Sequence, residues 1–149
     1  MPYQSTDPRP IPATIAVVVR DTQVLLVRRA NPPDAGLWGF PGGKVHQGEP
    51  LFDAATRELA EETGVAAEPL RVITALDAFD HDPAGVLRRH FILVAVLCRW
   101  TAGDPVAADD ALEARWIEIA ALKDGHLALS RDVAELADHA AALTAEVST

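Results

Sequence analysis

The sequence predicts a single mixed α/β domain. Three observations support this class: aliphatic and β-branched runs open the chain, an amphipathic helix separates them from further runs, and a second amphipathic helix follows near the end. The 149 residues, 49% apolar and 23% charged, fit one globular domain and leave no room for two ordinary ones. We therefore expect one domain over residues 1–149, with a strand order that these patterns leave open.

Two aliphatic runs predict a β-hairpin at the start of the fold. Ala13–Arg20 and Gln23–Arg29 are joined by two polar residues and have the composition of strands. A loop is predicted over Asn31–Gly36 from its Pro, Asn, Asp and Gly content. Leu37–Gly43 then reads as a short extended segment that ends in a turn.

The next segment, Leu51–Thr63, is predicted to be a helix. Pro50 suits its first turn, and Gly64 suits the left-handed position just past its end. An apolar stripe at i, i+3 and i+7 would dock the helix on the core. The stripe consists of Phe52, Ala55 and Leu59.

Three further strands and a helix complete the prediction. Leu70–Phe79 and Arg89–Trp100 are strands separated by a polar turn, and Glu113–Ile119 is a shorter one. The last helix is expected to begin near Ser130, which suits an N-cap. Its buried face would consist of Val133, Leu136, Ala137, Ala140 and Leu143.

Charge and hydropathy exclude several functional classes. The net charge of −9 argues against nucleic acid as a partner, because such binding depends on Lys and Arg neutralising phosphates. The longest apolar run, Phe91–Cys98, has eight residues, whereas a membrane span needs about 20. The first ten residues lack the basic and apolar regions of a secretory signal. We expect a cytoplasmic protein, with no membrane partner and with Cys98 buried as a free thiol.

Three carboxylates lie close together on the first predicted helix. Glu58, Glu61 and Glu62 occupy positions i, i+3 and i+4, so they share one face and repel one another. They also lie at the C-terminal end of the helix, where the dipole disfavours negative charge. A solvated acidic face is one interpretation. The other is a hard divalent cation such as Mg²⁺, which takes carboxylate oxygens and usually keeps water and substrate phosphates as further ligands.

The segment around these glutamates resembles the signature of the Nudix hydrolases. The match is at fixed spacing and includes every defined position of that signature, over residues 43–65. The matching positions are Gly43, Glu49, Arg57, Glu58, Leu59, Glu61, Glu62, Gly64 and Val65. The resemblance extends to the strand-rich N-terminal part, to the LWGFPGGK segment and to the EARW segment. It covers roughly residues 11–122.

The resemblance implies a Nudix fold, which is an α/β/α sandwich around a mixed sheet, and a catalytic centre with Mg²⁺, for which Mn²⁺ can substitute. By matching position, the metal ligands would be the backbone carbonyl of Gly42 and the carboxylates of Glu58, Glu61 and Glu62. Glu58 and Glu61 would be the catalytic carboxylates, with Glu58 as the candidate base. Glu49 and Arg57 would orient the glutamates through ion pairs.

Further candidates come from outside the signature. Asp110 and Glu113 precede a tryptophan where some relatives supply an extra acid; a solvated loop is the alternative. Arg29 resembles an arginine that contacts substrate phosphate, and Arg89 is a weaker example of the same kind. Trp38 could stack on a base, although an aromatic residue in such a segment is more often part of the core.

The resemblance implies hydrolysis of a pyrophosphate bond in a nucleoside diphosphate linked to another group. ADP-ribose or a related nucleotide sugar is the favoured substrate, and a nucleoside triphosphate, cleaved by a house-cleaning, mutator-preventing enzyme, is the alternative. The proline that ADP-ribose enzymes often carry after the signature is replaced by Asp80. A nucleotide-sensing regulator is less favoured, because it normally needs an added DNA-binding module. The family resemblance leaves a homodimer open.

Overall fold

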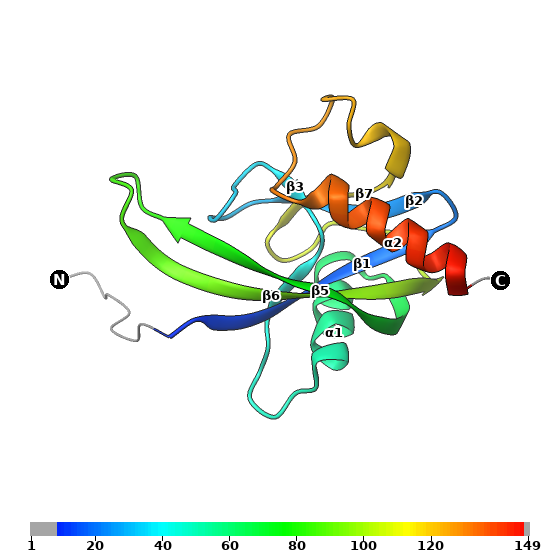
Figure 1. Cartoon of the computed structure of the whole chain (residues 1–149), viewed down its shortest axis with the longest axis horizontal. Helices are drawn as coiled ribbons and strands as arrows, with labels where there is room; N and C mark the ends of the chain where they lie inside the picture. The colour runs from blue at the N-terminus through cyan, green and yellow to red at the C-terminus, as the bar shows by residue number, and fades with distance from the viewer. Residues whose placement is uncertain (1–8, 148–149) are drawn as a thin grey trace.

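The computed structural model describes residues 9–147, and its centre is a mixed β-sheet (Figure 1). The strands are β1 (Ile11–Arg20), β2 (Gln23–Arg29), β3 (Trp38–Gly39), β4 (Gly42–Lys44), β5 (Ala66–His81), β6 (Leu87–Ala102) and β7 (Ala111–Glu118). Their order is β3-β2-β1-β6-β5, with β4 also paired to β1 and β7 to β2. β1 and β6 run parallel, and the other paired strands are antiparallel.

Two helices cover the two faces of this sheet. α1 (Leu51–Thr63) and α2 (Val133–Val147) lie on opposite sides of β1, and a short 3-10 helix spans Ile119–Ala121. Val17 and Val19 of β1 pack in the core under α2, whereas Ala16 and Val18 pack in the core under α1. A strand buried on both faces reads as an unbroken apolar run. The α/β class and the three-layer arrangement are confirmed.

The first predicted helix has the bounds that the sequence indicates. α1 begins at Leu51 and ends at Thr63, and Gly64 adopts a left-handed φ of 73°. The Gly64 amide donates to the Ala60 carbonyl oxygen at 2.9 Å, which closes the last turn. Ala55 and Leu59 are fully buried, so the predicted stripe docks the helix on the core.

The second helix begins at Val133, three residues after the predicted cap. Asp132 has a left-handed φ of 68°, and Ser130 is held in an extended segment by a hydrogen bond from its amide to the Trp38 carbonyl oxygen. Because Ser130 belongs to that extended segment, it does not cap α2, and the helix begins three residues later than the predicted cap implies. The five residues of the predicted apolar face are all buried.

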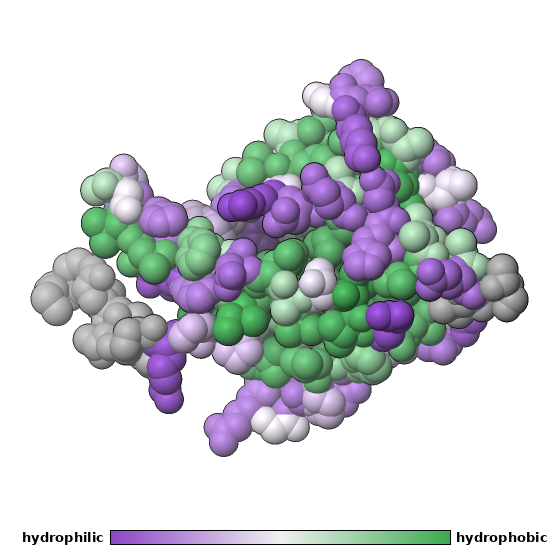
Figure 2. Space-filling view, viewed as in Figure 1, coloured by the Kyte–Doolittle hydropathy of each residue, from purple (hydrophilic) through white to green (hydrophobic). Residues whose placement is uncertain are grey.

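β5 and β6 are longer than predicted and form an arm. β6 first meets β1 where Phe91 pairs with Ile11, and closer to the turn its neighbour among the described strands is β5 alone. We call residues 79–90 the arm; it projects from the sheet in Figure 1. Apolar side chains are exposed on it, as Figure 2 shows. Cys98 of β6 is buried as predicted, and burial raises the pKa of its thiol to about 12.

No helix in the described part of the chain is long and apolar enough to cross a membrane.

Candidate active site

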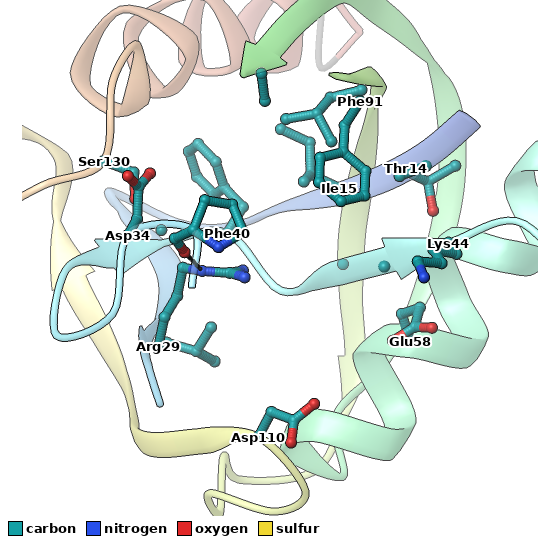
Figure 3. Close-up of a pocket in the computed structure, with 18 of the residues that line it drawn as sticks. Thr14, Ile15, Arg29, Asp34, Phe40, Lys44, Glu58, Phe91, Asp110 and Ser130 are labelled. Carbon is teal, nitrogen blue, oxygen red and sulfur yellow. Dashed lines mark hydrogen bonds between the residues drawn. The ribbon is translucent and has the colours of Figure 1, made fainter. Parts of the chain in front are cut away.

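A pocket of about 1110 Å³ opens beside the first turn of α2, between the arm and the loop that follows β2. One part of its wall is apolar and consists of Ile15, Phe40, Leu76, Phe91 and Leu93. Figure 3 shows Ile15 and Phe91 on one side of the pocket, with Glu58 and Asp110 on the other. The pocket therefore joins an apolar wall to an acidic end.

The acidic end is built on a close approach between β4 and α1. A Cβ atom on Gly43 would lie 2.6 Å from the Glu58 carboxylate, and one on Gly42 would lie 2.8 Å from the Ile15 Cα and overlap the Thr14 carbonyl oxygen. Two glycines in succession thus let the backbone pass between β1 and the glutamates. Their absent side chains explain why Glu58 can line the pocket.

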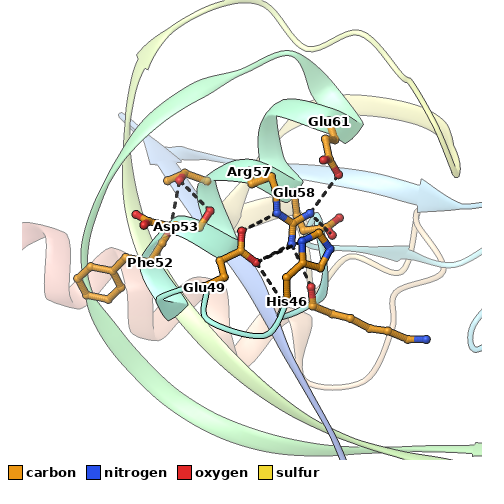
Figure 4. Close-up of polar contacts among 9 residues, drawn as sticks. His46, Glu49, Phe52, Asp53, Arg57, Glu58 and Glu61 are labelled. Atoms are coloured by element: carbon orange, nitrogen blue, oxygen red, sulfur yellow. Dashed lines mark hydrogen bonds and ion pairs between the residues drawn. The ribbon is translucent and has the colours of Figure 1, made fainter.

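Arg57 links three of the acidic side chains (Figure 4). Its Nε and Nη2 donate to the two oxygens of Glu49 at 2.6 and 2.9 Å. Its Nη1 donates to Glu58 at 2.9 Å and to Glu61 at 3.2 Å. The hydrogen bonds from Arg57 and from the His46 amide lower the pKa of Glu49 to about 2. The orienting contacts predicted for Glu49 and Arg57 are therefore present in the structure.

Glu62 is the buried member of the acidic end, with 9% of its surface exposed. Its Oε2 accepts the Gly42 amide at 2.7 Å. Burial raises the pKa of Glu62 to about 7, and the negative charges of Glu58 and Asp110 add to this rise, against the lowering by the Gly42 amide and Arg29. A buried carboxylate with acidic neighbours needs either a proton or a cation.

The donor set fits a hard divalent cation. Glu58, Glu61 and Glu62 each keep one carboxylate oxygen to which none of the described residues donates a hydrogen bond. All three side chains line the pocket. Across residues 9–147, no three His, Cys, Asp or Glu side chains lie close enough together in this structure to hold a metal ion, so the three glutamates would have to draw together around a cation. Such an open oxygen set suits Mg²⁺, which completes its coordination with water and phosphate.

The loop acids predicted from the sequence separate in the structure. Asp110 lines the pocket, together with Asp109, which has a left-handed φ of 52°. Glu113 belongs to β7, where it pairs with Arg28 across the ladder and accepts its Nε at 2.9 Å. Glu113 is not among the residues that line the pocket, whereas Asp110 is, and the role of either as a loop acid stays a prediction.

The sequence left two roles open for Trp38, base stacking and core packing, and the structure places it in the core. Its side chain is 5% exposed and packs in the core under α2, and the Arg115 guanidinium lies 4.9 Å from the ring centroid. The backbone of Trp38 pairs with β2 on one side and bridges to Leu129 on the other. Trp38 is therefore a core residue in the structure and not a platform for a base.

The two predicted arginines both line the pocket. Arg29 ends β2 and donates its Nε to the Pro33 carbonyl oxygen at 2.7 Å, which fixes the guanidinium beside the acidic end. Arg89 belongs to the arm and is bound to Asp80. Their contacts with a substrate remain predictions.

Sequence reasoning missed two hydroxyl groups. Thr14 and Ser130 line the pocket, and their buried side-chain oxygens have no hydrogen-bond partner among the residues that the structure describes. Buried polar atoms usually find a partner, so these oxygens are available to a ligand or to ordered water. A threonine within the apolar run of β1 is the one signal that the sequence offers for the first of them.

Comparisons with known proteins give consistent matches. A family model described as the NUDIX domain matches residues 9–137. An ADP-ribose pyrophosphatase of Methanocaldococcus jannaschii is 32% identical over 110 residues, covering 74% of this chain and 63% of that protein. A CTP pyrophosphohydrolase of Escherichia coli is 45% identical over 58 residues, covering 38% of this chain and 43% of that protein. The chain thus spans less than two thirds of these relatives.

The fold has counterparts among solved structures. A MutT NUDIX hydrolase from Burkholderia pseudomallei superimposes with a TM-score of 0.75 at 28% sequence identity, covering 88% of this chain and 98% of that one.

Proposed function

This chain belongs to the NUDIX family, and from that premise we propose that it is a pyrophosphohydrolase that uses a divalent cation, Mg²⁺ or in its place Mn²⁺. The observation that carries the proposal is the acidic end of the pocket. There, Glu58, Glu61 and Glu62 each offer one carboxylate oxygen to which no described residue donates a hydrogen bond, beside a pocket of about 1110 Å³.

The proposed roles of the residues come from their matching positions in the family signature and agree with the contacts at the acidic end. When bound, the cation would neutralise charge on the pyrophosphate oxygens and lower the pKa of attacking water. Glu58, Glu61, Glu62 and the Gly42 carbonyl oxygen would hold it. Glu58 or Glu61 would accept the proton from water, and the alternative base is the loop acid Asp110.

The cationic side chains have separate tasks in this scheme. Arg29 lies at the acidic end and would bind a phosphate oxygen through the nitrogens that Pro33 leaves unused. Arg57 is saturated by Glu49, Glu58, Glu61 and the Lys44 carbonyl oxygen, so it would orient the glutamates without touching substrate.

ADP-ribose or a related nucleotide sugar is the proposed substrate. The M. jannaschii relative is named for ADP-ribose and matches three quarters of this chain. A volume of about 1110 Å³ is ample for a nucleoside diphosphate with an attached sugar, given that pockets for drug-sized ligands have volumes of about 300–1,000 Å³. The alternative substrate is a nucleoside triphosphate. The E. coli relative named for CTP supports it, because this relative matches a shorter stretch of the chain at a higher sequence identity than the M. jannaschii relative does.

A turnover screen tests the proposal. The protein would be incubated with ADP-ribose, other nucleotide sugars and nucleoside triphosphates, with Mg²⁺ or with EDTA, and the products separated by chromatography. From ADP-ribose we expect AMP and ribose 5-phosphate, formed in the presence of Mg²⁺ and not in the presence of EDTA. A monophosphate and pyrophosphate from a triphosphate would instead support the alternative. Absence of turnover with every compound would contradict the enzyme and favour a nucleotide-sensing regulator.

A further inference from the structure

Asp80 is a buried carboxylate away from the acidic end of the pocket. It lies on β5 within the arm, and its side chain is 3% exposed. Its Oδ2 accepts Arg89 Nε at 2.9 Å and Arg89 Nη2 at 2.6 Å, and both of its oxygens lie 3.2 Å from Arg88 Nη2. Burial acts to raise the pKa of Asp80, but the hydrogen bonds from Arg89 and then Arg88 outweigh it and lower the pKa.

These contacts fix Arg89 in one orientation. Asp80 accepts hydrogen bonds from the Nε and Nη2 of Arg89, and the Cζ of Arg89 lies 5.4 Å from the centroid of the Phe91 ring. The guanidinium is therefore held at one edge by Asp80 and over a ring face by Phe91. None of the described residues accepts a hydrogen bond from Nη1. Arg89 and Phe91 both line the pocket.

The fixed orientation of Arg89 suits an oxygen-bearing ligand. Arg88 and Arg89 share the Asp80 carboxylate, and with Asp82 the formal charge of the arm is zero. The pair with Asp80 spans neighbouring strands of a hairpin that has no other strand beside it in the described structure. A nucleotide would therefore meet a hydrogen-bond donor that is already oriented, and its binding would not carry the entropic cost of ordering a free arginine side chain.

We propose that Asp80 is a positioning residue, which holds Arg89 so that its Nη1 donates to an oxygen of the bound nucleotide. This inference rests on the proposed function in one respect, that the pocket takes a nucleotide. A purely structural role, in which Asp80 only joins the two strands of the arm, makes a different prediction: its loss would lower the melting temperature and leave nucleotide affinity unchanged.

Calorimetric titration with ADP-ribose and with CTP, in EDTA, tests the proposal without turnover. The variants are Arg89→Gln, Asp80→Asn and the double variant. Arg99→Gln is the matched control, because Arg99 pairs with Glu68 across the same two strands but is 62% exposed and does not line the pocket. For the nucleotide that binds, Kd should rise about tenfold in each single variant and no further in the double variant, because both remove the same contact. The control should bind like the wild type.

Arg89→Lys keeps the charge but cannot reproduce the paired contact with Asp80, so it tests the same geometry if Asp80→Asn does not fold. Its Kd should rise as in Arg89→Gln. Wild-type affinity in Arg89→Lys or in Asp80→Asn, or additive effects in the double variant, would overturn the proposal while the pocket still bound nucleotide. A wild type that binds neither nucleotide would overturn the nucleotide pocket itself, and this inference with it.

Discussion

Replacing Gly43 by alanine would displace the carboxylate of Glu58, the proposed base, without removing it. The added Cβ would lie 2.6 Å from the Glu58 carboxylate, whereas ordinary contact begins at 3.4 Å, so the carboxylate must retreat by about 0.8 Å. Because the atoms in the way are the far end of a flexible side chain, the fold can yield at small cost. A displacement of about 1 Å at a reacting centre can reduce turnover about a hundredfold.

We therefore expect Gly43→Ala to lose about two orders of magnitude in kcat with a melting temperature within a few degrees of the wild type. Gly42→Ala is the contrasting variant, since its Cβ would meet the backbone of Thr14 and Ile15, which cannot yield in the same way. It should lower the melting temperature markedly. Steady-state kinetics and thermal unfolding of both variants provide the test. Full activity in Gly43→Ala would refute the placement of Glu58 against this turn.

Three further predictions concern the acidic end and the core. Glu62→Gln should reduce kcat by orders of magnitude and keep the fold, because a carboxamide oxygen can still accept the Gly42 amide; Glu68→Gln, an exposed glutamate on β5, is the kinetic control, and retained activity in Glu62→Gln would contradict the metal site. Since the pKa of Glu49 is about 2 instead of its ordinary 4.5, its ionised form adds stability above about pH 4.5 that is lost as the pH falls towards 2. Melting temperatures from pH 2 to 5 should therefore change less steeply in Glu49→Gln than in the wild type, and identical profiles would argue against the Arg57 pair as the cause. Leu59→Ala removes a fully buried side chain under α1 and should cost about 2–5 kcal/mol in denaturant unfolding; a cost below about 1 kcal/mol would contradict the packing of α1.

Features that depend only on residues close together in the sequence could be predicted. α1 begins and ends where its sequence indicates, because Pro50 and Gly64 act on the backbone of their own turns. The glutamate spacing likewise predicts a shared face, since helix geometry alone determines it. The contacts of Arg57 with the glutamates required the family resemblance as well.

The surroundings of Asp80 and Glu113 could not be predicted, because they depend on how the residues of one strand pair with those of another. Asp80 lies in a predicted turn, since Asp and Gly favour turns, yet it is buried because Arg88 and Arg89 meet it from the next strand. Glu113 reads as a loop acid until β7 pairs with β2 and brings Arg28 opposite to it. Both cases depend on strand register, which composition and spacing do not fix.

Cation binding tests the central claim most directly. Free Mn²⁺ would be followed by electron paramagnetic resonance as it is titrated into the wild type and into Glu61→Gln, whose parent side chain is 47% exposed and removable at little cost to the fold. The account predicts that the wild type binds Mn²⁺, that Mg²⁺ displaces it, and that the variant binds at least tenfold more weakly. No binding by the wild type, or equal binding by Glu61→Gln, would contradict the assignment of the acidic end as a metal site.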